Sequence, residues 1–146
     1  MAFKFRLEKV LEYRKQLEEQ AMLALAKAQA ARDAEIAKLE SLKHELVVQL
    51  EKSRNAAAMS GAERWLAQTY VLALRQDINQ STNFLVSLEQ EVDQCRGELV
   101  TRAQERELLE KLKSKQAKRF AEEEKLREQR DYDETATIRH NKKEAV

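Results

Sequence analysis

The sequence predicts an all-α protein, specifically a long two-helix antiparallel coiled-coil hairpin, and three observations support this prediction. The apolar residues between Val71 and Leu109 recur every three and four positions, as in a helix that buries a narrow seam against another helix. The chain of 146 residues has no proline and two glycines, so it offers few places for a sharp turn. Charged residues make up 36% of the chain and aromatic residues 5%, a composition typical of long helices. We therefore expect one elongated coiled-coil domain over residues 1–146.

The first helix is expected over about residues 3–56. Its seam begins in a register that includes Leu7, Val10 and Ala28, with Arg14 as the one polar member. The full apolar set of this register is Phe3, Leu7, Val10, Leu17, Ala21, Ala24 and Ala28. After Ala28 the pattern slips by one residue and continues through Ile36, Leu39, Lys43 and Leu46. Such a slip changes the local winding of a coiled coil without ending the helix.

The hairpin turn is expected at about residues 57–61. Gly61 can adopt a positive φ angle, which most residues resist. Ser60 and Glu63 have the spacing of a capping box, a signal that starts a helix. The second helix is therefore expected over about residues 62–138, followed by a frayed C-terminal tail.

Folding the chain back near residue 58 would place small seam residues opposite large ones, for example Ala28 opposite Leu88. This favours an intramolecular hairpin over a parallel dimer, so we expect a monomer in isolation. The same alignment places Arg14 near Arg102, an unfavourable pair. Beyond about Lys113 the second helix would have no partner within the chain. Residues 111–146 are also highly charged, with eleven basic and eight acidic residues.

The composition argues against catalysis and against several classes of ligand. The net charge of +1 gives no large field of one sign to attract nucleic acid or an anionic membrane. Gly61 and Gly97 are too far apart for a phosphate-binding loop, and the two histidines with Cys95 lack the spacing of metal ligands. We expect no enzyme activity, no cofactor, no metal and no small-molecule ligand. The absence of a long apolar run and of a signal-peptide core predicts a cytoplasmic protein.

Two groups of residues suggest contacts with other proteins. A basic set formed by Lys111, Lys113, Lys115, Lys118 and Arg119 either docks on an acidic protein surface or is a solvated helix face. The aromatic residues Trp65, Tyr70 and Phe84 lie at or beyond the edge of the expected seam. They either form a contact surface or lap over the seam near the turn.

Both ends of the sequence resemble the FliJ family of bacterial flagellar export proteins, and the resemblance covers nearly the whole chain. At the start it rests on the segment FKFRLEKVLEYRKQLEEQAMLALAKA, with Phe3, Phe5, Leu7, Val10, Leu11, Arg14 and Glu19 as markers. Near the end the markers are Leu109, Lys111, Glu123, Glu128, Gln129, Asp133, Glu134 and Ala136.

The resemblance implies a small, non-enzymatic stalk of the flagellar type III export apparatus, an antiparallel coiled coil similar to the γ stalk of rotary ATPases. It implies that the terminal end inserts into the hexameric export ATPase ring, promotes ring assembly and activity, and works with the regulator of that ATPase. The other end would reach the membrane-embedded export gate, so the protein would be cytoplasmic and peripherally associated with the inner membrane at the flagellar base. Members of the family also escort empty export chaperones.

From this resemblance and the unpaired overhang, we expect two sets of contact residues. The expected contacts with the ATPase are Phe3, Arg6, Leu7, Val10, Arg14, Leu109, Leu112, Phe120, Gln129, Asp133 and Glu134. The expected contacts with the export gate are Trp65, Tyr70, Leu74, Ile78 and Phe84. Two alternatives from other classes stay open: a general holdase chaperone, and a structural coiled-coil spacer that self-associates. The equivalent stalk of a virulence secretion system also stays open.

Overall fold

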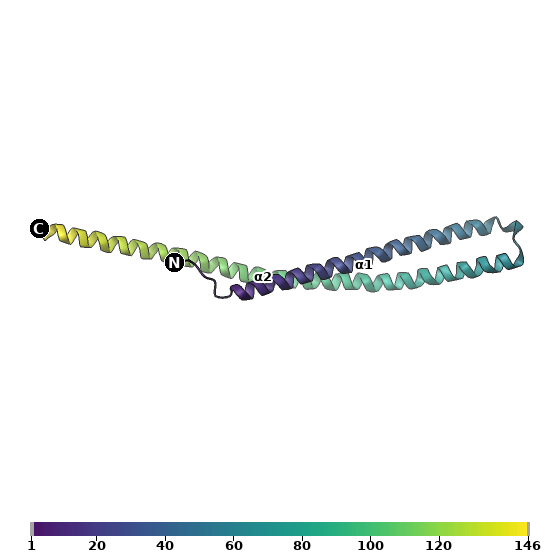
Figure 1. Ribbon diagram of the computed structural model, residues 1–146, viewed down its shortest axis with the longest axis horizontal. Coiled ribbons are helices and arrows are strands. Elements are labelled where there is room, and N and C mark those ends of the chain that lie inside the picture. Colours follow the sequence, from purple (N-terminus) through teal and green to yellow (C-terminus); the bar gives the residue numbers. More distant parts are fainter. Residues whose placement is uncertain (1, 146) are drawn as a thin grey trace. The chain divides into compact units, whose positions relative to one another are not determined.

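The computed structural model describes residues 2–145, with their side chains except that of residue 56, and confirms an all-α helical hairpin (Figure 1). Helix α1 spans Glu8–Arg54 and has 47 residues. A single 3₁₀ turn, η1, spans Ala56–Ala58. Helix α2 spans Gly61–Glu144 and has 84 residues. The first helix thus begins five residues later than residue 3, and the second continues six residues beyond 138.

The chain divides into two compact units, and each combines a stretch of α1 with a stretch of α2. The hairpin unit is Glu19–Thr101 and contains η1. The terminal unit consists of the described residues 2–18 and 102–145. Within each unit the stretches of α1 and α2 run in opposite directions (Figure 1).

The seam of α2 in the hairpin unit follows the register that the sequence predicts. Leu74, Leu88 and Val92 are buried, and the other predicted seam residues from Val71 to Leu99 are half-buried. Ser81, where the apolar pattern is interrupted, also belongs to the seam, with only 4% of its surface exposed. Its hydroxyl donates a hydrogen bond of 2.7 Å to Oε1 of Glu35 on α1, which compensates for burying a polar group.

The slip in the register of α1 that the sequence suggests is wrong. A row of buried and half-buried side chains instead continues along α1 at an uninterrupted spacing of three and four, while Ala24 and Lys43 are exposed and the half-buried Ile36 lies beside this row. In the hairpin unit this continuous seam consists of Ala21, Leu25, Ala28, Arg32, Glu35, Leu39, Leu42, Leu46, Gln49 and Ser53. An apolar pattern alone misses this register because several of its members are polar, and Glu35 lies in the seam with a partner on α2.

The turn uses the predicted capping box but not the predicted glycine conformation. The backbone N–H of Glu63 donates to Oγ of Ser60 at 3.2 Å, and the N–H of Ser60 donates to Oε2 of Glu63 at 3.4 Å. Among the described residues no glycine has a positive φ, so the expectation for Gly61 is wrong. Gly61 is instead the first residue of α2, because the Ser60 cap satisfies a free N–H group there and the chain enters the helix directly.

Candidate protein-interaction site

The N-terminal segment of the terminal unit packs against α2 before α1 begins. The ring centroids of Phe3 and Phe120 lie 5.6 Å apart, and Phe5 is buried with 8% of its surface exposed. The Glu8 N–H donates to the Phe5 carbonyl at 3.2 Å, where the chain turns into α1. The expectation that α2 lacks an intramolecular partner beyond Lys113 is therefore wrong, because residues 2–7 do not form the predicted start of the helix but an extended segment, which reaches along α2 as far as Phe120.

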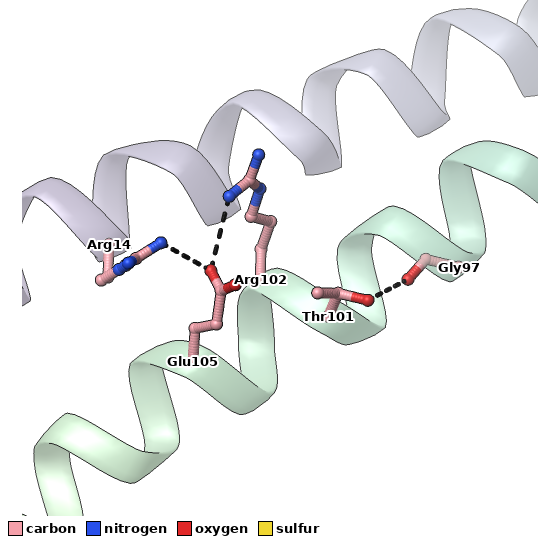
Figure 2. Close-up of polar contacts among 5 residues, drawn as sticks. All are labelled: Arg14, Gly97, Thr101, Arg102 and Glu105. Carbon is pink, nitrogen blue, oxygen red and sulfur yellow. Dashed lines mark hydrogen bonds and ion pairs between the residues drawn. The ribbon is translucent and has the colours of Figure 1, made fainter.

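A carboxylate joins two arginines in the seam of the terminal unit. Figure 2 shows Arg14 of α1 and Arg102 of α2 both directed at Glu105. The NH1 group of Arg14 donates to Oε2 of Glu105 at 2.8 Å, and NH1 of Arg102 donates to the same oxygen at 3.4 Å. The repulsion expected between Arg14 and Arg102 is thus offset by a shared anion, Glu105. The pairing of seam positions across the predicted hairpin did not include this residue.

A second charged group lies one helical turn away. Glu18 is buried, with 8% of its surface exposed, and accepts a hydrogen bond from Nε of Arg106. The NH1 group of Arg106 also donates to Oε2 of Glu110 at 2.7 Å. The hydrogen bond to Glu18 raises the pKa of Arg106, and the charges of Glu18 and Glu110 act in the same direction although partial burial opposes them. Arg106 is therefore held as a cation between two carboxylates.

The seam of the terminal unit consequently combines apolar and ionic contacts. Leu11 is almost fully buried, with 1% of its surface exposed. Nζ of Lys113 lies 2.8 Å from Oε2 of Glu8, which adds a third ionic contact between the N-terminal part of the chain and α2. No buried side-chain nitrogen or oxygen within residues 2–145 lacks a hydrogen-bond partner.

Helix α2 continues past these contacts as an exposed helix. Phe120 and Glu124 are half-buried, but every described residue from 125 to 145 is exposed. Leu126, Tyr132 and Ile138 are the large apolar side chains of this stretch, and each exposes more than half of its surface. A mostly charged helix with this exposure gains little from packing, so it is suited to ordering against a partner.

Comparison with known protein families identifies the chain. A family model described as "Flagellar FliJ protein" matches residues 3–145. The chain belongs to the FliJ family. No curated protein and no solved structure matches it. The match includes residues of both units, so membership of the family applies to both. It gives this FliJ-family protein a role related to flagellar protein export.

The structure brings all of the expected ATPase-contact residues of this FliJ-family protein into the terminal unit. Those with exposed side chains are Arg6, Leu7, Val10, Leu112, Gln129, Asp133 and Glu134. Those that are half-buried are Phe3, Arg14, Leu109 and Phe120. The sequence pattern placed Leu7 and Val10 in the seam, which is wrong because Leu11 occupies it. The exposed set therefore remains accessible to a partner.

The expected gate contacts all lie in the hairpin unit, but they differ in accessibility. Trp65, Tyr70 and Phe84 are exposed, with Trp65 exposing 65% of its surface. Leu74 is buried and Ile78 is half-buried within the seam. The Tyr70 hydroxyl donates to Oε1 of Glu45 at 3.3 Å, and partial desolvation together with this carboxylate raises the pKa of Tyr70.

Sequence reasoning missed the residues that make the ionic contacts. Glu8, Glu18 and Glu105 were not singled out, although each pairs with a basic residue on the opposite helix or segment. The signal was available, since Glu8 and Glu18 lie at seam spacing from Leu11 and Arg14, but the predicted register ran through Leu7, Val10 and Leu17 instead. Across the described part of the chain, no acidic, histidine or cysteine cluster suits a metal ion, and no helix has the length and apolar character needed to cross a bilayer.

Proposed function

We propose that this FliJ-family protein is a non-enzymatic stalk of the flagellar export apparatus whose terminal unit binds inside the hexameric export ATPase. Binding promotes assembly of the ring and its ATP hydrolysis, in cooperation with the regulator of the ATPase. The main support is the exposed stretch of α2 from residue 125 to 145 in a chain of this family.

The physical case rests on the contrast between the seam and this exposed stretch. Contacts of the N-terminal segment and α1 with α2 extend from Glu105 to Phe120, where they are satisfied within the chain. Beyond Glu124 the helix has charged groups on all sides and few apolar ones. A surrounding ring would bury the apolar side chains and neutralise charges, which would stabilise this helix on binding.

Truncation after Glu124 tests the proposal. Every described residue that this truncation removes is exposed, and the truncated chain keeps Phe120 and the ionic contacts at Glu8, Arg14 and Glu18. We expect the truncated chain to retain its helical circular dichroism signal per residue but to lose its stimulation of ATP hydrolysis by the export ATPase. Undiminished stimulation would contradict the proposal.

Side-chain substitutions with a matched control refine this experiment. The triple variant Gln129→Ala, Asp133→Ala and Glu134→Ala should weaken stimulation. The control Glu89→Ala, Gln90→Ala and Glu91→Ala removes the same two charges and one amide from exposed positions of the hairpin unit. The control should stimulate hydrolysis as the unaltered protein does, because it leaves the terminal unit unchanged.

We assign contact with the export gate to the exposed aromatics Trp65, Tyr70 and Phe84, which gives a protein peripherally associated with the inner membrane at the flagellar base. Leu74 and Ile78 support the seam beneath them and are not part of this contact. Escort of empty export chaperones belongs to the same proposal. Loss of co-purification with the gate protein in Trp65→Ala, with ATPase stimulation retained, would support the assignment.

The isolated chain is expected to be a monomer, because its seams are filled within each unit. Light scattering that gives the mass of one chain, 17.0 kDa, agrees with a stalk, whereas at least twice that mass favours a self-associating spacer. Suppression of aggregation of unrelated proteins, without any effect on the ATPase, would favour a holdase.

A further inference from the structure

The seam register defines two flanks of the terminal unit. Val10 and Leu17 each precede a seam residue of α1, and Leu112 precedes the seam residue Lys113 of α2. Seam positions along each helix are separated by alternating steps of three and four residues. In an antiparallel helix pair, the residue just before a seam position reached by a step of four lies on the same flank in both helices. The hairpin unit provides an example of the same rule, since Glu45 and Tyr70 occupy these positions and form a hydrogen bond of 3.3 Å.

One flank of the terminal unit, which we call the apolar flank, bears exposed apolar side chains from both helices. Val10 and Tyr13 of α1 expose 41% and 56% of their surface. Leu108 and Leu112 of α2, one turn apart, expose 67% and 37%. The half-buried Leu17 lies beside Val10 and Tyr13 on the same face of α1.

The charges nearest Leu108 and Leu112 on the apolar flank are basic, and the acidic Glu122 follows one turn beyond them. Lys115 and Arg119 follow Leu108 and Leu112 at helical spacing and are exposed. The acidic residue on this flank between positions 105 and 119 is Glu105, which Arg14 and Arg102 already neutralise. The apolar flank therefore suits a partner surface that is apolar and carries acidic residues.

The opposite flank has a different character. Its exposed and half-buried side chains include Glu8, Glu12, Glu107 and Glu110, and no large apolar side chain is exposed there among the described residues. Lys111 and Lys118 lie on the outer face of α2, between the two flanks. A hydrated flank of this kind gains little from burial. The two flanks of the terminal unit are thus unequal as docking surfaces.

We propose that the export ATPase contacts the terminal unit through the apolar flank, using an amphipathic helix whose apolar stripe carries acidic residues beside Lys115 and Arg119. This inference rests on the proposed function and specifies the chemistry of its contact. The apolar side chains supply most of the contact area, and the two cations orient the acidic helix.

Charge reversal on α2 provides a matched test. The variant Lys115→Glu with Arg119→Glu alters the apolar flank, and the control Lys43→Glu with Arg75→Glu makes the same change in charge at exposed positions of the hairpin unit. We expect the concentration of protein that gives half-maximal stimulation of the full export ATPase to rise about tenfold or more for the first variant, equivalent to about 1.4 kcal/mol of binding free energy. The control should shift it by less than about twofold, because mutations of exposed charges away from a contact have small effects.

An apolar pair gives an independent readout. Tyr13→Gln with Leu108→Gln removes the two most exposed apolar side chains of the apolar flank, and Leu66→Gln with Leu72→Gln is the control in the hairpin unit. The first pair should weaken stimulation, and the second should not. Circular dichroism checks that each variant keeps its helix content, and Lys115→Gln with Arg119→Gln replaces the charge reversal if that variant loses helix.

The outcomes separate this inference from the proposed function. If truncation after Glu124 abolishes stimulation but the apolar-flank variants and their controls behave alike, the inference is overturned and the stalk function stands. If the unaltered protein leaves ATP hydrolysis unchanged, both are overturned. Weakening confined to the apolar-flank variants supports the inference.

Discussion

At the scale of single residues, charge distinguishes the terminal unit. The Glu105 carboxylate accepts hydrogen bonds from both Arg14 and Arg102. It therefore also reduces the repulsion between these two cations. Arg14 and Glu105 keep about a third of their side-chain surface exposed, so solvent screens the pair and limits its contribution to stability. The value of Glu105 therefore lies in allowing Arg14 and Arg102 to occupy the same seam.

Replacing Glu105 by glutamine should destabilise the terminal unit by about 1 kcal/mol, because the charged acceptor that Arg14 and Arg102 share is lost. Amide hydrogen exchange measured over residues 8–18 should become faster, by about fivefold. Glu107→Gln is the control, since Glu107 is exposed and contacts Arg106 only at 3.8 Å. Equal acceleration in the two variants would contradict the role given to Glu105.

Gly97 is a residue whose replacement should stabilise the protein. It lies within α2, where glycine is unfavourable by about 1 kcal/mol relative to alanine. A Cβ atom at this position would meet nothing within 4 Å, and the Gly97 carbonyl would still accept the 3.1 Å hydrogen bond from Thr101 (Figure 2). Gly97→Ala should therefore raise the free energy of unfolding of the hairpin unit by about 1 kcal/mol in a denaturant titration. A decrease in the free energy of unfolding would contradict this prediction.

At the scale of elements, the two helices begin in different ways. Ser60 and Glu63 exchange hydrogen bonds at the start of α2, whereas α1 starts only after an irregular segment whose phenylalanines pack on α2. An N-terminal segment held by Phe3, Phe5 and the Glu8 ion pair extends the contact with α2 without forming a helix. The contact length of the terminal unit therefore exceeds the length of its α1 stretch.

Ser60→Ala removes the side-chain acceptor of the capping box. It should destabilise the hairpin unit by about 1 kcal/mol, because the Glu63 N–H loses its partner at an exposed helix start. Ser60→Asp keeps an acceptor and should remain near the stability of the unaltered protein. Thermal unfolding followed by circular dichroism compares the two variants, and equal melting temperatures would contradict the capping role.

At the scale of the whole molecule, the two units depend on different interactions. The hairpin unit has a mainly apolar seam, with Leu39, Leu74, Leu88 and Val92 buried. The terminal unit relies on ionic contacts at Glu8, Arg14 and Glu18 together with Leu11 and the phenylalanines. Such contacts respond to ionic strength, whereas burial of apolar surface does not weaken with salt in the same way.

High salt should therefore affect the terminal unit first. At about 1 M sodium chloride the screening length falls to about 3 Å, which weakens partly exposed ion pairs. Amide exchange should become faster in residues 8–18 while protection around Leu74 to Val92 is retained or increased. A matched titration of the Glu105→Gln variant should show a smaller salt effect. Uniform acceleration across both units would contradict this difference.

Much of the fold could be predicted from the sequence, and the reasons lie in particular residues. The α2 register from Val71 to Leu99 is apolar and regular, so periodicity alone identified it. The α1 register was misread because Arg32, Glu35 and Gln49 occupy seam positions that an apolar count treats as gaps. For the site, the sequence identified both sets of candidate residues, but it did not distinguish Leu74, which is buried, from Trp65, which is exposed.

The sequence by itself determined that two long helices form, where the chain reverses, and which family the protein resembles, because helix periodicity and the capping box are local properties. Only the tertiary structure decided how the charged seam residues pair, that residues 2–7 pack on α2, and which flank of the terminal unit is apolar. These features depend on side chains from distant parts of the chain meeting each other. A pattern along one helix does not contain the position of the other helix, and it is that position that turns Glu105 from a surface acid into a link between Arg14 and Arg102.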